Sequence, residues 1–186
     1  MPNSRFNQRN VVLGSGLSLD GYGATADRRM SFVPMPDAEQ LVAFYNRIDT
    51  VIVALEPEEL ANWSERAADF VGTLLTWYCL SDTAEPGYRD NVHFTREQPG
   101  ELVRRLQALP GRDIWLLASG DLVRRFLEED LIDAMSLGLG PMVLGAGVPL
   151  FAPGSPRRDF RIVSTHLHRS GLVTLNLDRV RTAESA

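Results

Sequence analysis

The chain has 186 residues and a net charge of −5, and its hydrophobic and charged fractions, 44% and 23%, are those of a globular protein with a sizeable core. Every basic residue is an arginine, which excludes lysine Schiff-base chemistry and the lysine of a phosphate-binding P-loop. The acidic balance argues against nucleic-acid binding, which needs a basic surface.

The N-terminal residues contain no apolar core of a secretory signal, and the uncharged stretch 135–152 contains glycines and prolines that a lipid-facing helix excludes. We therefore expect no membrane segment and a cytoplasmic location. The single cysteine, Cys79, lies in an apolar run and is interpreted as a buried, unreactive thiol. We expect a loosely ordered N-terminus over 1–9, one domain over 10–178 and a frayed tail over 179–186.

Strands and helices are expected to alternate along the first half of the chain. After Asp37 a helix is predicted, because Leu41, Phe44, Tyr45 and Ile48 follow helical spacing. The other predicted elements are a strand at 10–17, a loop at 23–36, a strand at 49–54, a helix beginning at 56, a strand at 74–80, a loop at 84–90 and a strand at 92–95.

The second half repeats the alternation and ends in a hairpin. Its predicted elements are a helix at 99–109 with Leu102, Leu106 and Leu109 inward, a strand at 114–118, a helix at 120–129 with Leu122, Phe126 and Leu127 inward, a strand at 134–139, and paired strands at 160–167 and 171–177. Alternating strands and helices indicate an α/β fold with a mainly parallel sheet, to which the hairpin adds antiparallel strands.

The stretch from Asp113 to Phe151 is the most informative part of the chain. It reads as a buried strand, a turn of small residues, an amphipathic helix, a second strand and a loop rich in glycine and proline. A short turn between a strand end and a helix start is where α/β proteins bind nucleotides, since the helix N-terminus offers free N–H groups and a partial positive charge. This stretch therefore predicts a ligand site.

Several segments match sequence motifs of one known family. They are Ser18-Leu19-Asp20-Gly21-Tyr22 after the first strand, Ile48-Asp49-Thr50-Val51, Asp113-Ile114-Trp115-Leu116-Leu117, Leu131-Ile132-Asp133, and the stretch from Pro141 to Phe151. Together they resemble the dihydrofolate-reductase-like family, in the branch of the reductase domain of bacterial riboflavin biosynthesis, the RibD C-terminal domain. The similarity runs from the first strand to the last.

The resemblance implies a three-layer α/β/α dihydrofolate-reductase-like fold, with a mainly parallel mixed sheet and a C-terminal antiparallel hairpin. It implies an oxidoreductase that transfers a hydride from NADPH or NADH to a small pteridine-, pyrimidine- or carbonyl-type substrate. It also implies a homodimer, for which Leu137, Leu139 and the 142–151 loop offer apolar surface.

The same resemblance implies two sets of site residues. The cofactor would lie against Ser81, Ser119, Gly120, Asp121, Leu122, Leu144, Gly145 and Gly147. The substrate would be held by Ser18, Asp20 and Gly21. Asp20 is the catalytic candidate, because its carboxyl group can anchor a substrate N–H or assist protonation. The alternative is a turn-forming aspartate that bonds its own backbone.

The sequence departs from the family pattern where phosphate would bind. Leu55 and Glu56 stand in place of an Arg-Lys pair, Asp82 in place of an arginine, and Ala118-Ser119 in place of Gly-Gly. Carboxylates repel phosphate, so these changes predict weak or altered binding of NADPH. A second hypothesis is therefore a non-catalytic ligand-binding relative with a degenerate NADPH site. A third is a relative that uses flavin or NADH, with Glu56 accepting a ribose hydroxyl.

Two further sets of residues have structural alternatives. Ser119 and Asp121 contact a ligand or simply cap the following helix, and the cap is the interpretation that we favour. His166 and His168 share one face of a strand and could bind a metal. With no third ligand in view, we expect an exposed strand face and no metal site.

Overall fold

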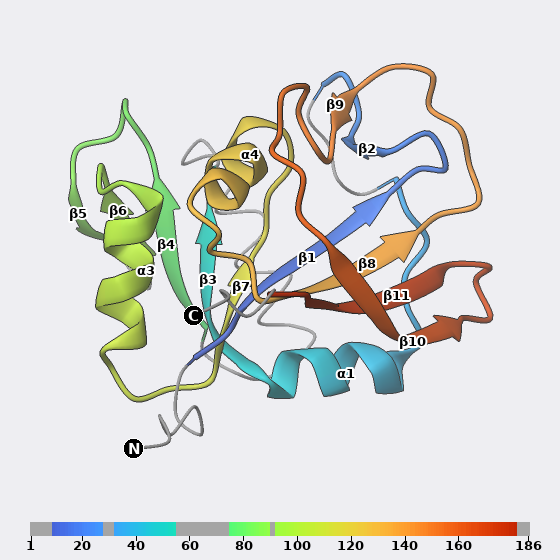
Figure 1. The fold of residues 1–186 in the computed structure, drawn as a ribbon, viewed down its shortest axis with the longest axis horizontal. Coiled ribbons are helices and arrows are strands. Elements are labelled where there is room, and N and C mark those ends of the chain that lie inside the picture. Colours follow the sequence, from blue (N-terminus) through green and yellow to red (C-terminus); the bar gives the residue numbers. More distant parts are fainter. Residues whose placement is uncertain (1–8, 28–31, 55–74, 90–91, 182–186) are drawn as a thin grey trace. The chain divides into compact units, whose positions relative to one another are not determined.

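The computed structural model describes residues 9–27, 32–54, 75–89 and 92–181 (Figure 1). The chain divides into two compact units, of which the first comprises Met1–Val11 and Ala38–Leu117, and the second comprises Val12–Asp37 and Ala118–Ala186. Each unit is thus built from two separate stretches of chain.

The first unit holds a sheet in which neighbouring strands follow the order β7-β3-β4-β6-β5. The described strands are β3 (Ile48–Val53), β4 (Thr76–Leu80), β5 (Gly87–Arg89), β6 (Val92–Thr95) and β7 (Asp113–Leu116), and the described helices are α1 (Ala38–Asn46) and α3 (Pro99–Gln107). The pairs β7–β3, β3–β4 and β4–β6 are parallel, and β5 runs antiparallel to β6.

The core of the first unit follows from continuous apolar strands. Val51, Ile52 and Val53 are fully buried in succession, which is the pattern of a parallel strand covered on both faces. Trp77 and Cys79 are also buried. The predicted burial of the Cys79 thiol is therefore confirmed.

Arg9 lies within the segment that we expected to be loosely ordered, and it is buried. Its guanidinium group bonds the side chains of Asp49 and Thr50, and it donates to the carbonyl oxygen of Arg112 at 2.6 Å. The described, packed part of this unit therefore begins one residue before the predicted boundary at residue 10.

The second unit contains strands in the order β10-β11-β8-β1. They are β1 (Val11–Leu17), β8 (Ala134–Leu139), β10 (Phe160–Leu167) and β11 (Val173–Arg179), and the helix among the described residues of this unit is α4 (Asp121–Glu128). Strands β1 and β8 are parallel, β8 and β11 are antiparallel, and β10 and β11 form the predicted C-terminal hairpin.

A separate two-stranded sheet joins β2 (Tyr22–Ala24) to β9 (Val148–Pro149), and Figure 1 shows the two strands side by side. Both were predicted as loop. Strands this short carry no readable periodicity, and their pairing depends on a partner that is distant in the sequence. The same reason explains why β5, within the predicted loop at 84–90, was missed.

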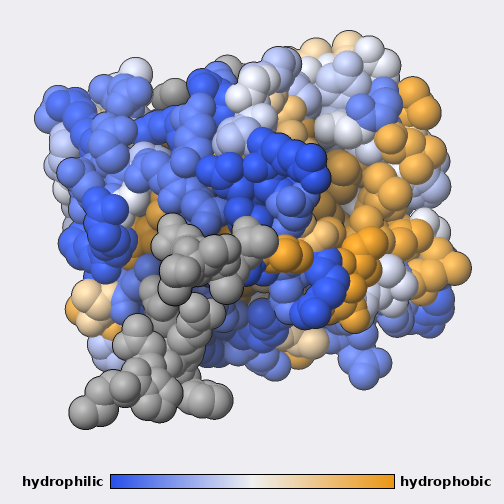
Figure 2. Space-filling model, in the orientation of Figure 1, coloured by the Kyte–Doolittle hydropathy of each residue, from blue (hydrophilic) through white to orange (hydrophobic). Residues whose placement is uncertain are grey.

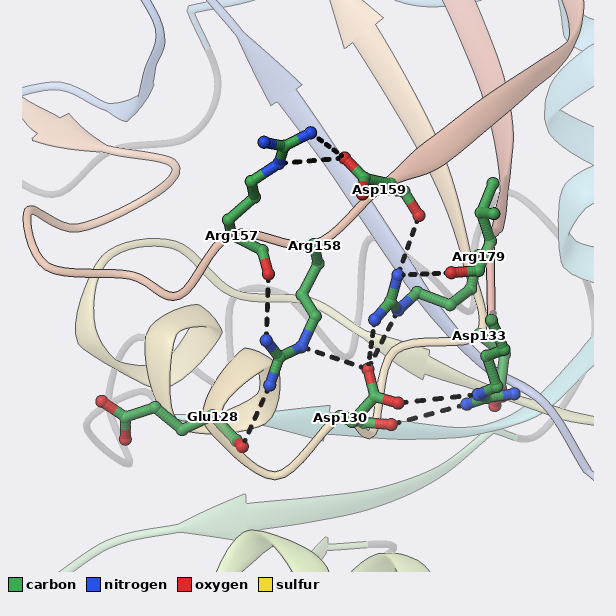
Figure 3. Close-up of polar contacts among 9 residues, drawn as sticks. Glu128, Asp130, Asp133, Arg157, Arg158, Asp159 and Arg179 are labelled. Atoms are coloured by element: carbon green, nitrogen blue, oxygen red, sulfur yellow. Dashed lines mark hydrogen bonds and ion pairs between the residues drawn. The ribbon is translucent and has the colours of Figure 1, made fainter. Parts of the chain in front are cut away.

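The carboxylate of Asp130 connects three segments of the second unit (Figure 3). Arg179 of β11 donates to it at 2.9 Å, and Arg158 lies 3.3 Å away. Burial opposes ionisation, but the hydrogen bond from Arg179 and the charges of Arg181 and Arg158 together hold the pKa of Asp130 below its ordinary value. This network fixes the end of α4, the segment before β10 and the C-terminal strand to one another.

Two predicted positions lie elsewhere than expected. Ile48 is the first residue of β3 rather than the last inward position of the preceding helix, which ends at Asn46. Leu109 lies beyond α3 and is 51% exposed, because the helix ends two residues earlier than predicted. The helix expected from residue 56 falls outside the described residues.

Residues 135–152 begin within strand β8 and continue into a loop, as predicted, and this loop contains the unpredicted strand β9. Within the described ranges, none of the helices has the length and the apolar character that crossing a bilayer requires.

We expect the substitution of leucine by alanine to lower the free energy of unfolding more at a core position than at a surface position. Leu102→Ala removes a fully buried side chain of α3 and should lower the free energy of unfolding by about 2–5 kcal/mol. Leu109→Ala, the matched control on a half-exposed side chain, should lower it by less than about 1 kcal/mol. Urea denaturation measures both, and equal losses would contradict the helix boundary.

Candidate functional site

The carboxylate of Asp20 joins two segments that are far apart in the sequence. It accepts a hydrogen bond from the Ser18 hydroxyl at 2.6 Å, and from the backbone N–H groups of Leu144 at 3.1 Å and Gly145 at 2.8 Å. The Ser18 hydroxyl in turn accepts from the N–H of Tyr22 at 3.0 Å, and Ser18 is completely buried. Asp20 therefore fastens the turn after β1 to the loop before β9. This role goes beyond the alternative considered above, an aspartate that only bonds the backbone of its own turn.

These contacts determine the protonation state of Asp20. The hydrogen bond from Ser18, opposed by partial desolvation and aided by the Gly145 and Leu144 amides, lowers the pKa of Asp20 to about 2. At neutral pH the group is therefore ionised and has no proton to donate. It can accept a hydrogen bond from a ligand, because a carboxylate has more acceptor positions than these contacts use.

Backbone hydrogen bonds reinforce this attachment. The N–H of Leu19 donates to the carbonyl of Met142 at 2.8 Å, and the N–H of Leu150 donates to the carbonyl of Gly21 at 2.9 Å. Gly21 has a φ of +87°, a conformation that favours glycine. The predicted substrate turn and the predicted cofactor loop are consequently parts of one structure.

The start of α4 belongs to the same structure. Gly120 precedes the helix with a φ of +65°, and its N–H donates to the carbonyl of Pro149 at 2.9 Å. A Cβ at Gly120 would lie 3.1 Å from the Val148 side chain, so this position combines a glycine conformation with a close contact. The N–H of Gly120 is thereby used within the protein and is not offered to a ligand.

The predicted capping role of Ser119 and Asp121 is wrong. The N-cap is Gly120, and within the described part of the chain no side chain caps α4. Asp121 is the first helical residue and forms an ion pair with Arg124 at 3.1 Å. The N–H groups of the first turn therefore lack a side-chain partner, which is the condition for binding an anion at a helix start.

Gly23 is a functional candidate that sequence reasoning missed. A Cβ at this position would lie 2.9 Å from the Cβ of Ser119, so β2 passes directly against the turn before α4. Gly147 makes a similar close approach, since a Cβ there would lie 2.3 Å from the Ala24 carbonyl oxygen. The only signal in the sequence was glycine itself, because neither contact has a local pattern.

The structure thus brings ten of the eleven predicted site residues into one unit. They are Ser18, Asp20, Gly21, Ser119, Gly120, Asp121, Leu122, Leu144, Gly145 and Gly147. Leu122 is buried, so it can contact a ligand only through its backbone, and the amides of Leu144 and Gly145 are engaged by Asp20.

The eleventh residue, Ser81, belongs to the first unit. Its hydroxyl accepts hydrogen bonds from the N–H of Ala84 at 3.0 Å and of Thr83 at 3.3 Å, so it closes the loop after β4. Asp82 beside it is exposed. Leu55 and Glu56, the other departures from the family pattern, lie outside the described residues.

Acidification should release the loop that Asp20 holds. Because its folded-state pKa is lowered, the carboxylate stabilises the attachment above pH 3.8, and this contribution is lost as the pH falls towards about 2. We expect NMR to show Asp20 titrating near pH 2, together with shifts of the Leu144 and Gly145 amides.

The matched variants separate Asp20 from other carboxylates of the unit. Asp20→Asn should speed hydrogen exchange at Leu144 and Gly145 by about tenfold, since it weakens the acceptor of both amides. Asp121→Asn, an exposed carboxylate without these contacts, should leave their exchange unchanged. Identical exchange in both variants would contradict the attachment.

Comparison with known proteins identifies relatives that match most of the chain. The family model of the RibD C-terminal domain matches residues 75–175. Two Bacillus subtilis (strain 168) proteins, both named as uncharacterized, are similar to the chain. YyaP is 26% identical to this chain, and the match covers 92% of this chain and 96% of YyaP. YwjB is 29% identical, and the match covers 85% of this chain and 91% of YwjB.

Solved structures show the same fold. A Shewanella sp. PV-4 protein named for riboflavin biosynthesis is 25% identical, with a TM-score of 0.74 over 92% of this chain and 99% of that one. A Corynebacterium diphtheriae pyrimidine reductase-like protein has a TM-score of 0.67 at 14% identity, and the match covers 98% of this chain and 96% of that one. These likenesses confirm the predicted dihydrofolate-reductase-like fold. With the family model matching more than half of its residues, the chain belongs to the RibD C-terminal domain family.

Proposed function

We propose that this protein is an NAD(P)H-dependent reductase that transfers a hydride to a small pteridine-, pyrimidine- or carbonyl-type substrate. The observation that carries the proposal is the joining of the Ser18–Gly21 turn, the start of α4 and the 144–147 loop within one unit. Membership of the RibD C-terminal domain family supports it, since reductase domains of that family use NADPH in general.

The backbone around α4 fits the diphosphate of a dinucleotide. The first turn of the helix has no side-chain cap among the described residues, and Gly120 precedes it with a φ of +65°. A nicotinamide cofactor supplies a hydride when bound. The residues that would hold it are Ser119 to Leu122 at the helix start and the 144–147 loop, where Gly145 is exposed.

The charges at the start of α4 fit a phosphate poorly. Asp121 contributes a carboxylate at the helix start, and the guanidinium group of Arg124 is engaged by Asp121 and by Glu128 at 2.8 Å. The family pattern also has an arginine at the position of Asp82, a residue that is exposed within the first unit. An extra 2′-phosphate therefore gains little, and we propose weak binding with little preference for NADPH over NADH.

On the substrate side, Asp20 acts as an anchor. Its ionised carboxylate accepts a hydrogen bond from a substrate N–H, and its own contacts with Ser18, Leu144 and Gly145 fix its orientation. In the reaction, the substrate carbon gains a hydride, the double bond to its oxygen or nitrogen is reduced, and the heteroatom takes a proton. With a pKa of about 2, Asp20 does not supply that proton, which comes from water or another acid.

The non-catalytic alternative has its own supporting observation. Several polar groups of the site are satisfied within the protein, among them the amides of Gly120, Leu144 and Gly145. Such internal hydrogen bonds are expected of a binding protein that kept the fold and lost its cofactor. Separate titrations of the purified protein with NADPH, NADH and FMN distinguish the three hypotheses: a nicotinamide reductase, a flavin-using relative, or a binding protein that takes neither.

Restoring the family's cation should tighten NADPH binding selectively. We expect Asp82→Arg to favour NADPH over NADH by a factor of roughly 2–5, the small value reflecting solvent screening of an exposed charge. Isothermal titration measures both affinities. Submicromolar affinity of the unaltered protein for NADPH would contradict the proposed charge mismatch.

Two controls separate position from net charge. Asp82→Asn removes the carboxylate without adding a cation and should give a smaller gain. Glu85→Arg makes the same charge change three residues further along the loop, on a side chain that is 82% exposed, and should leave the NADPH/NADH ratio unchanged. An equal gain in Glu85→Arg would mean that bulk charge alone is responsible.

A homodimer remains our prediction for the assembly. Leu137 of the expected patch is buried. Large apolar side chains of the second unit are exposed in the expected loop and in β10: Val143, Phe151, Ile162, Val163 and Leu167. Figure 2 shows hydrophobic residues gathered on the surface of the second unit. Three of these residues lie in β10, the outermost strand of its sheet, where an unpaired edge favours association.

Sedimentation velocity at micromolar concentration should therefore give a dimer. Val163→Glu, on β10, should convert it to a monomer because the substitution places a charge in the proposed contact. Val42→Glu, on a comparably exposed valine of α1, is the control that should remain dimeric. Sedimentation of the unaltered protein as a monomer would contradict the prediction.

A further inference from the structure

Two histidines and an aspartate of the second unit meet at the end of β10. Asp37 immediately precedes α1, His166 lies in β10, and His168 begins the turn towards β11. One possible ligand atom of each residue lies within 4.8 Å of the others. The sequence showed only the histidine pair, and the fold adds the third group from a position 131 residues before His168.

Two of the distances between the three groups are close to those of a metal site. Oδ2 of Asp37 lies 3.6 Å from Nε2 of His166 and 3.6 Å from Nδ1 of His168. Zinc holds nitrogen and oxygen ligands tetrahedrally at about 2.0–2.2 Å, which places neighbouring ligand atoms roughly 3.3–3.5 Å apart. Small movements of the carboxylate and of the exposed His166 ring would therefore bring all three groups onto one ion.

The hydrogen bonds of His168 select the tautomer that such a site needs. Nδ1 accepts the Asp37 N–H at 2.9 Å, so the ring proton is on Nε2, which lies 2.7 Å from the Thr174 hydroxyl oxygen. A metal-binding imidazole characteristically has its other nitrogen held by such a partner. Binding at Nδ1 would replace one neutral hydrogen bond, a much weaker interaction than a metal–nitrogen bond.

The two oxygens of Asp37 face different partners. Oδ1 lies 3.5 Å from Nε of Arg169, whose side chain is 92% exposed and therefore well screened, while Oδ2 faces both imidazoles. His168 is buried and fixed, whereas His166 is 41% exposed, which leaves a path from solvent. The group thus has two neutral-nitrogen donors, one carboxylate oxygen and an open side.

We propose that Asp37, His166 and His168 bind one divalent transition-metal ion, for which Zn²⁺ is the best match. Two imidazoles and one carboxylate suit zinc, cobalt, nickel or copper rather than magnesium or calcium, which prefer oxygen ligands. A water molecule completes the coordination on the exposed side. The ion ties the segment before α1 to the β10–β11 hairpin, and the proposal does not depend on the reductase reaction.

The test uses the untagged, full-length protein, freed of metal with a chelator and titrated with ZnCl₂ in competition with a chromophoric chelator. We expect one Zn²⁺ per chain, and a higher midpoint of thermal unfolding when the ion is present. His166→Ala and Asp37→Asn should each weaken binding by about tenfold or more, because each removes a ligand. Binding should also weaken on acidification, since protons compete for the imidazoles.

His93→Ala is the matched control. His93 is the one histidine of the chain that is not part of the proposed site. It stacks on Tyr78 in the first unit, so its loss should leave zinc binding unchanged. As a readout that needs no variant, ¹⁵N spectra should show zinc-dependent shifts of the ring nitrogens of His166 and His168 and none at His93. The proposal is overturned if binding is not saturable, if the variants bind as the parent does, or if the His93 ring alone responds.

Discussion

The candidate site depends on one carboxylate. Asp20 holds the turn after β1 against the loop before β9 through the N–H groups of Leu144 and Gly145, more than 120 residues away in the sequence. Backbone bonds at Leu19 and Leu150 then align the two segments, and Pro149 positions the start of α4 through Gly120. Without a fixed anion at position 20, two backbone donors would lose their partner and the loop would lose two charge-assisted hydrogen bonds.

This use of Asp20 has a chemical consequence. The contacts that hold the loop also keep the carboxylate ionised, so the same residue cannot serve as a proton donor at neutral pH. The site therefore suits hydride acceptance by an anchored substrate with the proton coming from elsewhere. An orienting anion and a helix start without a side-chain cap are features that a reductase and a binding protein can share, which is why cofactor affinity separates the two functions.

Ionic networks assemble the second unit at two further points. Asp130 gathers arginines from β11 and from the segment before β10, and Asp37 lies against His166, His168 and Arg169 at the end of the hairpin. They differ in the balance of their charges. Around Asp130 the guanidinium groups of Arg158, Arg179 and Arg181 surround one carboxylate. Around Asp37 the neighbours include two imidazoles, which can be neutral and can bind a metal.

The sequence by itself determined the order of the long elements and the family. Continuous apolar runs such as Val51 to Val53, and the helical spacing of Leu122, Phe126 and Leu127, are local patterns, and local patterns report which face an element buries. The hairpin at 160–177 and the motif from Pro141 to Phe151 were readable for the same reason.

Only the tertiary structure decided what the polar residues do. The partners of Asp20, the pairing of β2 with β9, the glycine cap of α4 and the meeting of Asp37 with His168 all join positions distant in sequence or depend on a backbone angle. A hydrogen bond requires two groups within about 3 Å, and spacing along a chain does not specify that distance until the fold is formed.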